Sequence, residues 1–259
     1  MGTVSAPLVL TEKVGEHITV ITINRPERRN AVDGATARAM EAAIDSFEED
    51  SESRVAILRG AGSSFSAGQD LKAAAMGDFG ATERRGGFGV MAVRPAKPLI
   101  AAVEGHALAG GFELCLACDL VVASTDTTMG IPEAAKALVA VGGGLFRLPK
   151  RIPYHIAMEL ALTGEARPAE YFARWGLVNY VVPRDAVFTT AVELARKIVK
   201  SGPLAVQAST EIVRRAYDWT DEDAWKQQRA YADPAIASED TQEGIRAFIE
   251  KREPVWKGR

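Results

Sequence analysis

The sequence predicts an α/β fold followed by a helical C-terminal region. Short runs rich in Val, Ile and Leu alternate with stretches of helical periodicity as far as about Val182. Beyond that point only helical patterns follow. The composition, with 47% hydrophobic and 25% charged residues in 259, is that of a globular protein. Strands that alternate with helices favour crossover connections, so an α/β core is expected before the helical region.

The predicted strands are short, apolar and mostly bounded by turn residues. They cover residues 17–24, 54–60, 99–105, 119–124 and 177–182. A helix is expected from Asp33, because one stripe at helical spacing holds the apolar residues Ala37, Met40, Ala43, Ile44 and Phe47.

The C-terminal part contains four helical stretches, which cover residues 186–202, 203–219, 221–232 and 239–252. Pro203 and Pro234 are expected to punctuate this region. The predicted division is therefore a core of residues 1–190 and a helical region of residues 191–259.

Charge and hydropathy exclude several classes of partner. The net charge is -3, and no block of like charge resembles a nucleic-acid or membrane patch. Residues 1–17 lack the pattern of a secretory signal, and they do not match the N-myristoylation motif. No uncharged run approaches the ~18 residues of a membrane span. We expect a cytoplasmic protein with a small-molecule partner, without nucleic acid or membrane.

The two cysteines, Cys115 and Cys118, form a CxxC pair. With three scattered histidines and no second pair, ligands for a structural metal site are too few. A redox role would need an exposed helix start. We expect two small apolar residues on a buried helix face and no metal site.

The stretch AGGFELCLAC, residues 109–118, places the carboxylate of Glu113 within an otherwise apolar run. Burying a charge costs several kcal/mol or more unless a partner compensates it. Either such a partner exists or chemistry requires the group.

Three glycine-rich stretches follow predicted strands, at residues 65–71, 105–113 and 141–148. None matches a P-loop or GxGxxG. The first two place backbone N–H groups at a strand-to-helix junction, which favours an anion. Two N–H groups that converge on one oxygen would form an oxyanion hole, and Gly110 precedes Glu113 by one helical turn.

Glu133 follows Pro132 near an expected helix start. It is either an ordinary first-turn acid stabilised by the helix dipole or, together with Glu113, a general acid or base.

The motifs NRPERRNA, FSAGQDLK, IAAVEGHALAGGFELCLACDL, IPEA and the glycine run before RLPKRIP resemble the crotonase (enoyl-CoA hydratase/isomerase) superfamily, in order and spacing. The resemblance covers essentially the whole chain. It implies a spiral of ββα repeats over residues 1–190 and a helical trimerisation region over residues 191–259. The assembly would be a homotrimer or a dimer of trimers.

The resemblance also implies a site that binds an acyl-CoA thioester. The backbone N–H groups of Gln69 and Gly110 would hold the thioester oxygen, and Glu113 and Glu133 would add water to a trans-2-enoyl-CoA. Coenzyme A belongs to the substrate, so no separate cofactor and no metal are expected.

The same resemblance implies residues that contact coenzyme A: Arg25, Arg28 and the backbone around Ala67. Phe248 and Lys251 would reach the coenzyme A of a neighbouring subunit. For Arg28 an ordinary solvated arginine is the alternative.

Within the superfamily, DLKAAAMGDFG, GGFG, ARWGLVNYVV and FIEKREPVWKGR resemble the carnitinyl-CoA dehydratases, which interconvert crotonobetainyl-CoA and carnitinyl-CoA. A quaternary ammonium favours an aromatic face or a carboxylate. The candidates for such an acyl pocket are Phe79, Phe88 and Phe112, with core packing as their alternative. The glycine run reads VAVGGGLFRL, which departs from the Pro-Gly and Thr-Gln-Arg pattern of many short-chain hydratases.

Two other functions remain open. A Δ3,Δ2-enoyl-CoA isomerase would need only one carboxylate as a proton shuttle. A non-catalytic protein that binds acyl-CoA or RNA would keep the fold without turnover.

Overall fold

The computed structural model describes residues 6–259. Residues 1–5, where the expected absence of a targeting signal partly falls, lie outside the described residues. Within the described part, the main sheet has six strands in the order β1-β2-β3-β6-β8-β11. The β1 strand runs antiparallel to β2, and the other neighbours are parallel. Their bounds are Val9–Lys13, Ile18–Ile23, Val55–Gly60, Leu99–Val103, Leu120–Ser124 and Tyr180–Val182.

Residues 6–259 also form a second sheet of three short strands, which lies beside the first and has the order β10-β9-β7. These are Arg167–Pro168, Thr128–Gly130 and His106–Leu108; β4 and β5, Ala81–Thr82 and Gly86–Gly87, form a hairpin. The strand-strand-helix order recurs along the chain: β6 and β7 lead into α3 (Gly110–Ala117), and β8 and β9 lead into the 3-10 turn η2 (Ala134–Lys136) and α4 (Gly144–Arg147). The predicted repeat of ββα units is confirmed.

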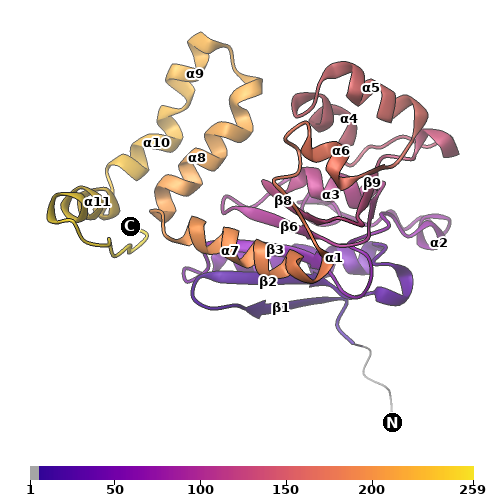
Figure 1. The fold of residues 1–259 in the computed structure, drawn as a ribbon, viewed down its shortest axis with the longest axis horizontal. Helices are drawn as coiled ribbons and strands as arrows, with labels where there is room; N and C mark the ends of the chain where they lie inside the picture. The colour runs from indigo at the N-terminus through magenta and orange to yellow at the C-terminus, as the bar shows by residue number, and fades with distance from the viewer. Residues whose placement is uncertain (1–5) are drawn as a thin grey trace.

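The remaining helices surround the sheets and extend from them (Figure 1). Their bounds are α1 Gly34–Glu49, α2 Leu71–Ala74, α5 Tyr154–Thr163, α6 Ala169–Ala173, α7 Val187–Val199, α8 Pro203–Arg215, α9 Asp221–Gln227, α10 Arg229–Ile236 and α11 Glu239–Glu250. Short 3-10 turns are η1 Pro26–Arg28, η3 Leu148–Lys150, η4 Arg184–Ala186 and η5 Ala216–Asp218. Among residues 6–259, no helix combines the length and apolar character that crossing a membrane requires.

The central strands are apolar throughout because both faces of the sheet are covered. Alternate residues of one strand enter different cores: Ile18 and Val20 pack under α7, whereas Ile21 and Ile23 pack on the side of α1 and α3. The α1 helix begins as expected, with the Asp33 side chain accepting a hydrogen bond from the N–H of Thr36. Its buried face contains the whole predicted stripe, Ala37, Met40, Ala43, Ile44 and Phe47.

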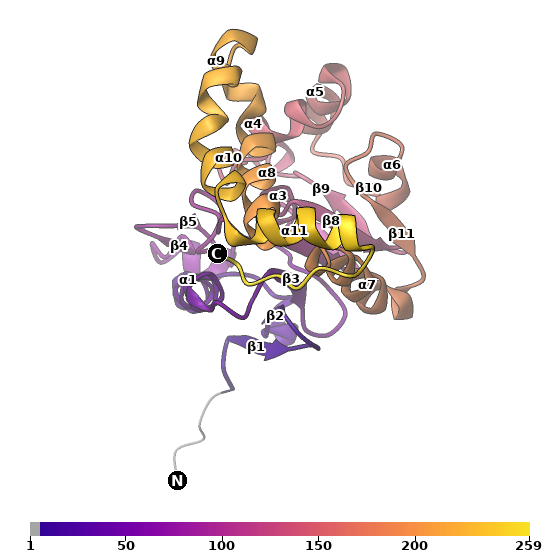
Figure 2. The same cartoon turned by 90° about the vertical axis from the view of Figure 1, so that its left-hand side faces the viewer.

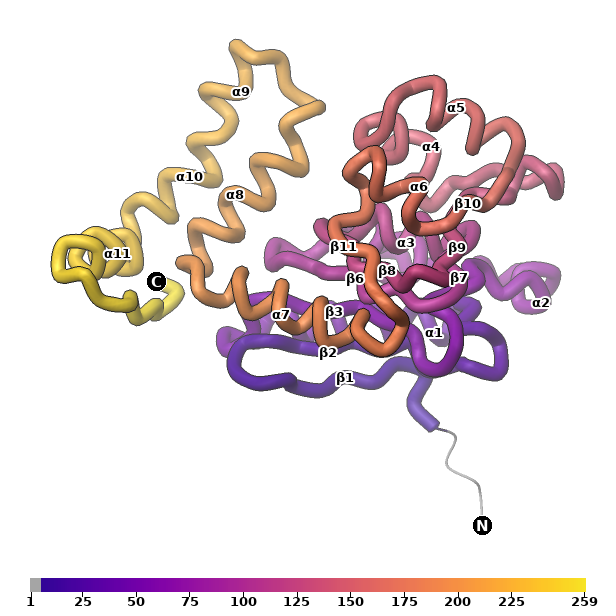
Figure 3. The backbone as a smooth tube through the Cα atoms, in the orientation of Figure 1, coloured from indigo at the N-terminus to yellow at the C-terminus, as the bar shows by residue number. Residues whose placement is uncertain are grey.

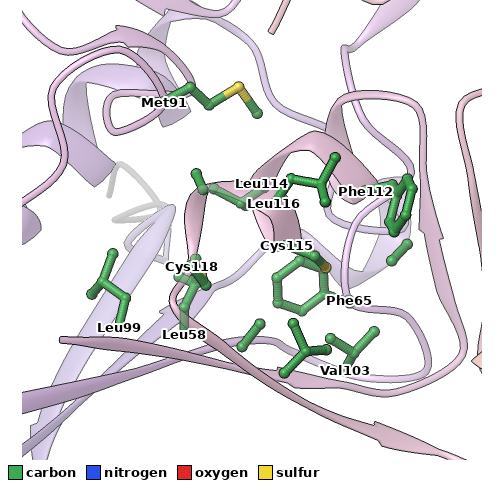
Figure 4. Packing of buried hydrophobic residues seen from close by; sticks show 14 of the residues in the cluster. Leu58, Phe65, Met91, Leu99, Val103, Phe112, Leu114, Cys115, Leu116 and Cys118 are labelled. Atoms are coloured by element: carbon green, nitrogen blue, oxygen red, sulfur yellow. The ribbon is translucent and has the colours of Figure 1, made fainter. Parts of the chain in front are cut away.

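The α3 helix lies within the core, and all of its residues are buried. Figure 4 shows Cys115 and Cys118 packed with Phe65 and Leu58 among the apolar side chains around this helix. Burial raises the pKa of both thiols, which keeps them protonated. The prediction of two apolar residues on a buried helix face is confirmed.

The helices α8 and α9 extend away from the sheets, and α10 returns beside α8 to α11, which lies beside the C-terminus (Figures 1 and 3). The predicted boundary at residues 190 and 191 falls inside α7, which packs on the sheet through Val187, Ala191, Val192 and Ala195. The helices that leave the core therefore begin with α8.

The C-terminal tail folds back along α11, as Figure 2 shows, and returns to the core. The Trp256 indole donates a hydrogen bond to the carbonyl of Lys200 at 2.8 Å, and its carbonyl accepts one from Arg54 at 3.1 Å. The Asp240 carboxylate accepts from the N–H groups of Lys257 and Gly258. The tail that carries the dehydratase resemblance thus has a structural role, fixing α11 to the start of α8.

Several details differ from expectation. Pro203 starts α8, but Pro234 lies inside α10. The glycine run at 141–148 follows η2 and a loop rather than a strand. The β1 strand was not predicted, because four of its five residues are exposed and no apolar alternation marks it.

Candidate active site

The candidate site begins where β7 ends and α3 starts. Ala109 has φ +53° and ψ −128°, a conformation that residues with a Cβ rarely adopt. Its N–H donates to the carbonyl of Gly130 at 2.9 Å, and its own carbonyl accepts from Phe112 at 2.9 Å and Glu113 at 3.1 Å. Because a trans peptide directs its C=O and N–H oppositely, the N–H of Gly110 points away from the helix. Such strain costs about 1–3 kcal/mol and persists where surrounding contacts fix it.

The second predicted donor, Gln69, lies in the adjoining loop. Val32 donates its N–H to Gly68 and accepts from the N–H of Asp70, both at 2.9 Å, so the N–H of Gln69 faces away from Val32. Gly68 has φ +92°, and a Cβ there would lie 2.9 Å from the nitrogen of Gly110. Within residues 6–259 the N–H groups of Gln69 and Gly110 donate to no protein acceptor. The structure therefore brings two free donors together.

Phe88 covers the start of α3. Its side chain is 5% exposed, and its own backbone has φ +53°. A Cβ on Gly110 would lie 2.5 Å from the Phe88 ring, so glycine is required where the ring meets the helix. Of the three aromatic residues predicted to line an acyl pocket, Phe88 is the one placed beside the free N–H groups.

Glu113 is 4% exposed and is compensated by backbone donors. The N–H of Gly144 donates to Glu113 Oε1 at 2.8 Å. A Cβ at Gly142 would lie 2.6 Å from Glu113 Oε2, so the carboxylate rests directly on the glycine run. Burial raises the pKa of Glu113, while the N–H groups of Gly144 and Gly142 and the charge of Arg147 act in the opposite direction.

Glu133 lies at the start of η2, where its carbonyl accepts hydrogen bonds from the N–H groups of Lys136 and Leu138 at 2.9 and 3.0 Å. Its side chain is 9% exposed, and in the described part of the chain its Oε2 has no hydrogen-bond partner. Burial raises the pKa of Glu133 to about 7, and the negative charge of Glu113 contributes to that rise.

Both carboxyl groups have a raised pKa, and the negative charge of Glu113 contributes to the rise at Glu133. Glu113 receives backbone N–H donors, which favour its ionised form. Two interacting carboxyl groups, one of them with a pKa of about 7, can remove one proton and supply another. No group of three His, Cys, Asp or Glu side chains among residues 6–259 is arranged to hold a metal ion.

Arg25 was predicted to contact coenzyme A, but the structure gives its guanidinium internal partners. It forms ion pairs with Asp33 at 2.9 Å and Asp70 at 3.1 Å and donates to the carbonyl of Ala31. Its side chain is 11% exposed. Arg25 therefore braces the loop that carries Gln69, and nothing in this geometry supports a phosphate contact.

Arg28 and Ala67 are more accessible. Arg28 lies in η1, is exposed, and has no ion pair within residues 6–259. Ala67 is half-buried, and its N–H donates to the carbonyl of Arg29 at 2.9 Å. This contact links the arginine-rich turn to the loop that precedes Gln69.

Phe248 and Lys251 lie at the other end of the molecule. Phe248 on α11 is 85% exposed, and Lys251 follows at the end of that helix. Figure 1 shows α11 far from α3 and α4, so one chain does not bring these residues to its own Glu113.

The other two aromatic candidates do not face the carboxyl pair. Phe112 is fully buried, and its ring lies 5.0 Å from that of Phe172 in the core. Phe79 is 70% exposed on the loop after α2. For Phe112 the alternative of core packing is the one that the structure supports.

Sequence reasoning missed the groups that hold Glu113. Gly142 and Gly144 were noted as a glycine-rich run, but nothing in the sequence connects that run to a residue about thirty positions earlier. Three glycines in a row were the available signal, because a carboxylate packed on the backbone excludes a Cβ. Arg147, which bonds to the same run, was also not identified.

A cavity of about 1370 Å³ in the described part of the chain lies between α8 and α4, on the far side of the glycine run. Neither Glu113 nor Glu133 lines it. Four arginines do so: Arg94, Arg147, Arg151 and Arg214. Gly142, Gly143 and Arg147 thus line this cavity, whereas the two carboxyl residues do not.

Comparison with known families gives a match over residues 13–259 to the model of the enoyl-CoA hydratase/isomerase family. Among curated proteins, the carnitinyl-CoA dehydratase of Salmonella enteritidis is 44% identical over 254 residues, which cover 93% of this chain and 95% of that protein.

Solved structures resemble this one closely. An enoyl-CoA hydratase of Mycobacterium marinum superposes with a TM-score of 0.95 at 49% identity, covering 98% of this chain and 100% of that one. A carnitinyl-CoA hydratase of Mycobacterium avium superposes with a TM-score of 0.78 at 40% identity, covering 98% of this chain and 100% of that one.

Proposed function

Because the chain belongs to the enoyl-CoA hydratase/isomerase family, we propose that it adds water reversibly across the C2=C3 bond of a trans-2-enoyl-CoA. One observation carries this proposal: Glu113 and Glu133 are both buried with a raised carboxyl pKa, and Glu113 lies in the first turn of the helix that presents the N–H of Gly110. Addition of water needs one group to remove a proton and another to supply one, and the pair provides both.

The proposed reaction begins with a water molecule between the two carboxyl groups. Glu113 removes one proton from water as the oxygen bonds to C3, and Glu133 transfers its proton to C2. Negative charge that develops on the thioester oxygen is stabilised by the N–H groups of Gln69 and Gly110. Losing one such donor typically costs about 2.7–4 kcal/mol. At the end Glu113 holds a proton and Glu133 is ionised, and proton exchange with solvent restores the pair.

The acyl group we propose is crotonobetainyl, with carnitinyl-CoA as the hydrated product. The 44% identity to a carnitinyl-CoA dehydratase supports this choice. A trimethylammonium group favours an aromatic face or a carboxylate. Phe88 lies beside Gly110 and offers such an aromatic face. Initial hydration rates with crotonobetainyl-CoA and crotonyl-CoA test the assignment: a preference for crotonobetainyl-CoA is expected, and turnover of crotonyl-CoA alone would contradict it.

The isomerase alternative is tested with a 3-enoyl-CoA. An isomerase would produce the 2-enoyl-CoA without net hydration, whereas the proposed hydratase produces 3-hydroxyacyl-CoA from the 2-enoyl substrate. Tight binding of either thioester without turnover would instead indicate a non-catalytic protein. The net charge of -3 and the absence of a basic block disfavour RNA binding.

We also propose that the chain assembles as a homotrimer or a dimer of trimers. Eight exposed apolar side chains lie in the helical region that leaves the core and in the tail after it, and exposed apolar surface of this kind is typical of an interface. They are Val213, Tyr217, Trp225, Ile236, Ile245, Phe248, Ile249 and Val255. In such an assembly Phe248 and Lys251 would contact coenzyme A bound to a neighbouring chain. Light scattering after size-exclusion chromatography tests the assembly, and a monomer would contradict it.

A further inference from the structure

Arg147, the last residue of α4, reaches back over the glycine run and ties it to another segment. Its guanidinium donates to the carbonyl of Met91 at 2.5 Å and to the carbonyl of Gly142 at 3.3 Å. It also lies 5.3 Å from the centroid of the Phe146 ring. A Cβ on Gly143 would lie 2.5 Å from one of its nitrogens, so the guanidinium rests directly on this backbone.

The opposite side of the same run holds Glu113. The N–H of Gly144 donates to Glu113 Oε1, and the N–H of Gly142 also interacts with this carboxylate. Residues 142–144 are therefore clamped on one side by Arg147 and bear the proposed base on the other. A shift in this segment would move the N–H groups that orient and ionise Glu113.

We propose that Arg147 is a positioning residue for hydration, which acts on Glu113 through the segment of residues 142–144. This inference rests on the proposed function of Glu113 as the base. The planar guanidinium offers several donors in a fixed fork, and here two of its nitrogens bond to carbonyls from segments about fifty residues apart. A lysine carries one ammonium and does not reproduce both contacts in that geometry.

The positive charge of Arg147 also favours the ionised form of Glu113. This charge opposes the rise in the pKa of Glu113 that burial causes. Burial lowers the pKa of Arg147 itself; Arg151 and Arg214 lower it further, and Glu113 and the Cys118 thiol raise it. Arg147 therefore faces Glu113 across the glycine run as a cation held among other cations, and its removal should make Glu113 harder to ionise.

The test compares Arg147→Gln and Arg147→Lys with Arg151→Gln as a matched control. Arg151 lines the same cavity, but within residues 6–259 its side chain makes no hydrogen bond to the glycine run. In Arg147→Gln, kcat should fall by about 10²-fold, the magnitude expected when a reacting group is misplaced by about 1 Å. The KM should change far less than kcat, and the acidic limb of the pH–kcat profile should move to higher pH.

The Lys variant separates charge from geometry. Arg147→Lys should restore the position of the acidic limb but only part of kcat, and Arg151→Gln should leave both near wild type. An unshifted acidic limb in Arg147→Gln, or equal losses in Arg147→Gln and Arg151→Gln, would overturn the inference. If Arg147→Gln does not fold, Arg147→Lys still decides, because a kcat equal to that of wild type would exclude a need for the fork.

A second readout does not require turnover. Infrared titration of Glu113 with ¹³C-labelled glutamate, using Glu113→Gln for assignment, reports its pKa in the free protein. This pKa should be higher in Arg147→Gln than in wild type, and equal values would overturn the inference even in an active hydratase. If instead no enoyl-CoA is hydrated but the pKa rises as expected, the proposed function fails while the link between Arg147 and Glu113 stands.

Discussion

The backbone N–H of Gly144 donates a hydrogen bond of 2.8 Å to Oε1 of Glu113, across 31 positions of sequence. This contact shows how an acidic side chain is tolerated in an otherwise apolar helix. The donor favours the ionised form of Glu113, and the glycine has no Cβ to displace the carboxylate.

Gly142→Ala should inactivate the protein more than it unfolds it. The new Cβ would lie 2.6 Å from Glu113 Oε2 and 2.8 Å from the sulfur of Met91, so the carboxylate or the loop must move. We expect kcat to fall by about 10²-fold and the free energy of unfolding by about 1–3 kcal/mol. Gly202→Ala is the control, because its Cβ would meet nothing closer than 3.8 Å. Wild-type kcat in Gly142→Ala would show that the carboxylate does not depend on this packing.

The pH dependence of hydration should follow the protonation of Glu133. Its pKa is raised to about 7, so kcat/KM should decline as the pH rises through about 7, when this acid becomes ionised. The decline on the acidic side should report protonation of Glu113. Rate measurements between pH 5 and 9 check this expectation, and a flat profile across neutral pH would be inconsistent with Glu133 as the acid.

The same shift predicts how stability depends on pH. The ordinary pKa of 4.5 applies to the unfolded chain, and the folded value is about 7. Between these values the folded chain binds more protons, so the stabilising contribution of protonated Glu133 is lost as pH rises through that window. Glu133→Gln should therefore be more stable than wild type above pH 7, by on the order of 1–3 kcal/mol. Urea unfolding at pH 5 and pH 8 measures the difference, which should be larger at pH 8.

Substitution of Arg25 should lower the stability of the fold, whereas substitution of Arg28 should weaken binding of the acyl-CoA. Arg25→Gln leaves Asp33 and Asp70 without their cation, so we expect a loss of about 3 kcal/mol in unfolding free energy. Arg28→Gln should leave stability unchanged and raise the KM for the acyl-CoA, with an effect that weakens at high salt. Thermal unfolding measures the stability of both variants, and steady-state kinetics at two salt concentrations measure their KM. A raised KM without destabilisation in Arg25→Gln would instead return Arg25 to the coenzyme A site.

Local patterns predicted much of the fold. The stripe from Ala37 to Phe47 identified the buried face of α1, and the run at 99–105 identified β6, because burial on both faces makes a strand apolar throughout. The β1 strand was missed because its side chains are mostly exposed and only its backbone pairs with β2.

Local composition predicted part of the site, and the family resemblance supplied the other candidate residues. Glu113 stood out because its neighbours are apolar. The protection of Glu113 by Gly144, and the pairing of Arg25 with Asp33 and Asp70, join segments that are distant in sequence. No local periodicity encodes such contacts. The sequence therefore suggested the carboxylate but not the backbone that holds it, and it could not show that Arg25 is already paired.

The central claim is hydration by the Glu113 and Glu133 pair, and one measurement tests it most directly. Initial rates of 3-hydroxyacyl-CoA formation from crotonobetainyl-CoA and crotonyl-CoA should be measured for wild type, Glu113→Gln and Glu133→Gln. Wild type should hydrate at least one substrate, and each substitution should lower kcat by about 10²–10⁴-fold while the protein still binds the thioester. Wild-type rates in Glu133→Gln, or no hydration of either substrate by the wild-type protein, would contradict the account.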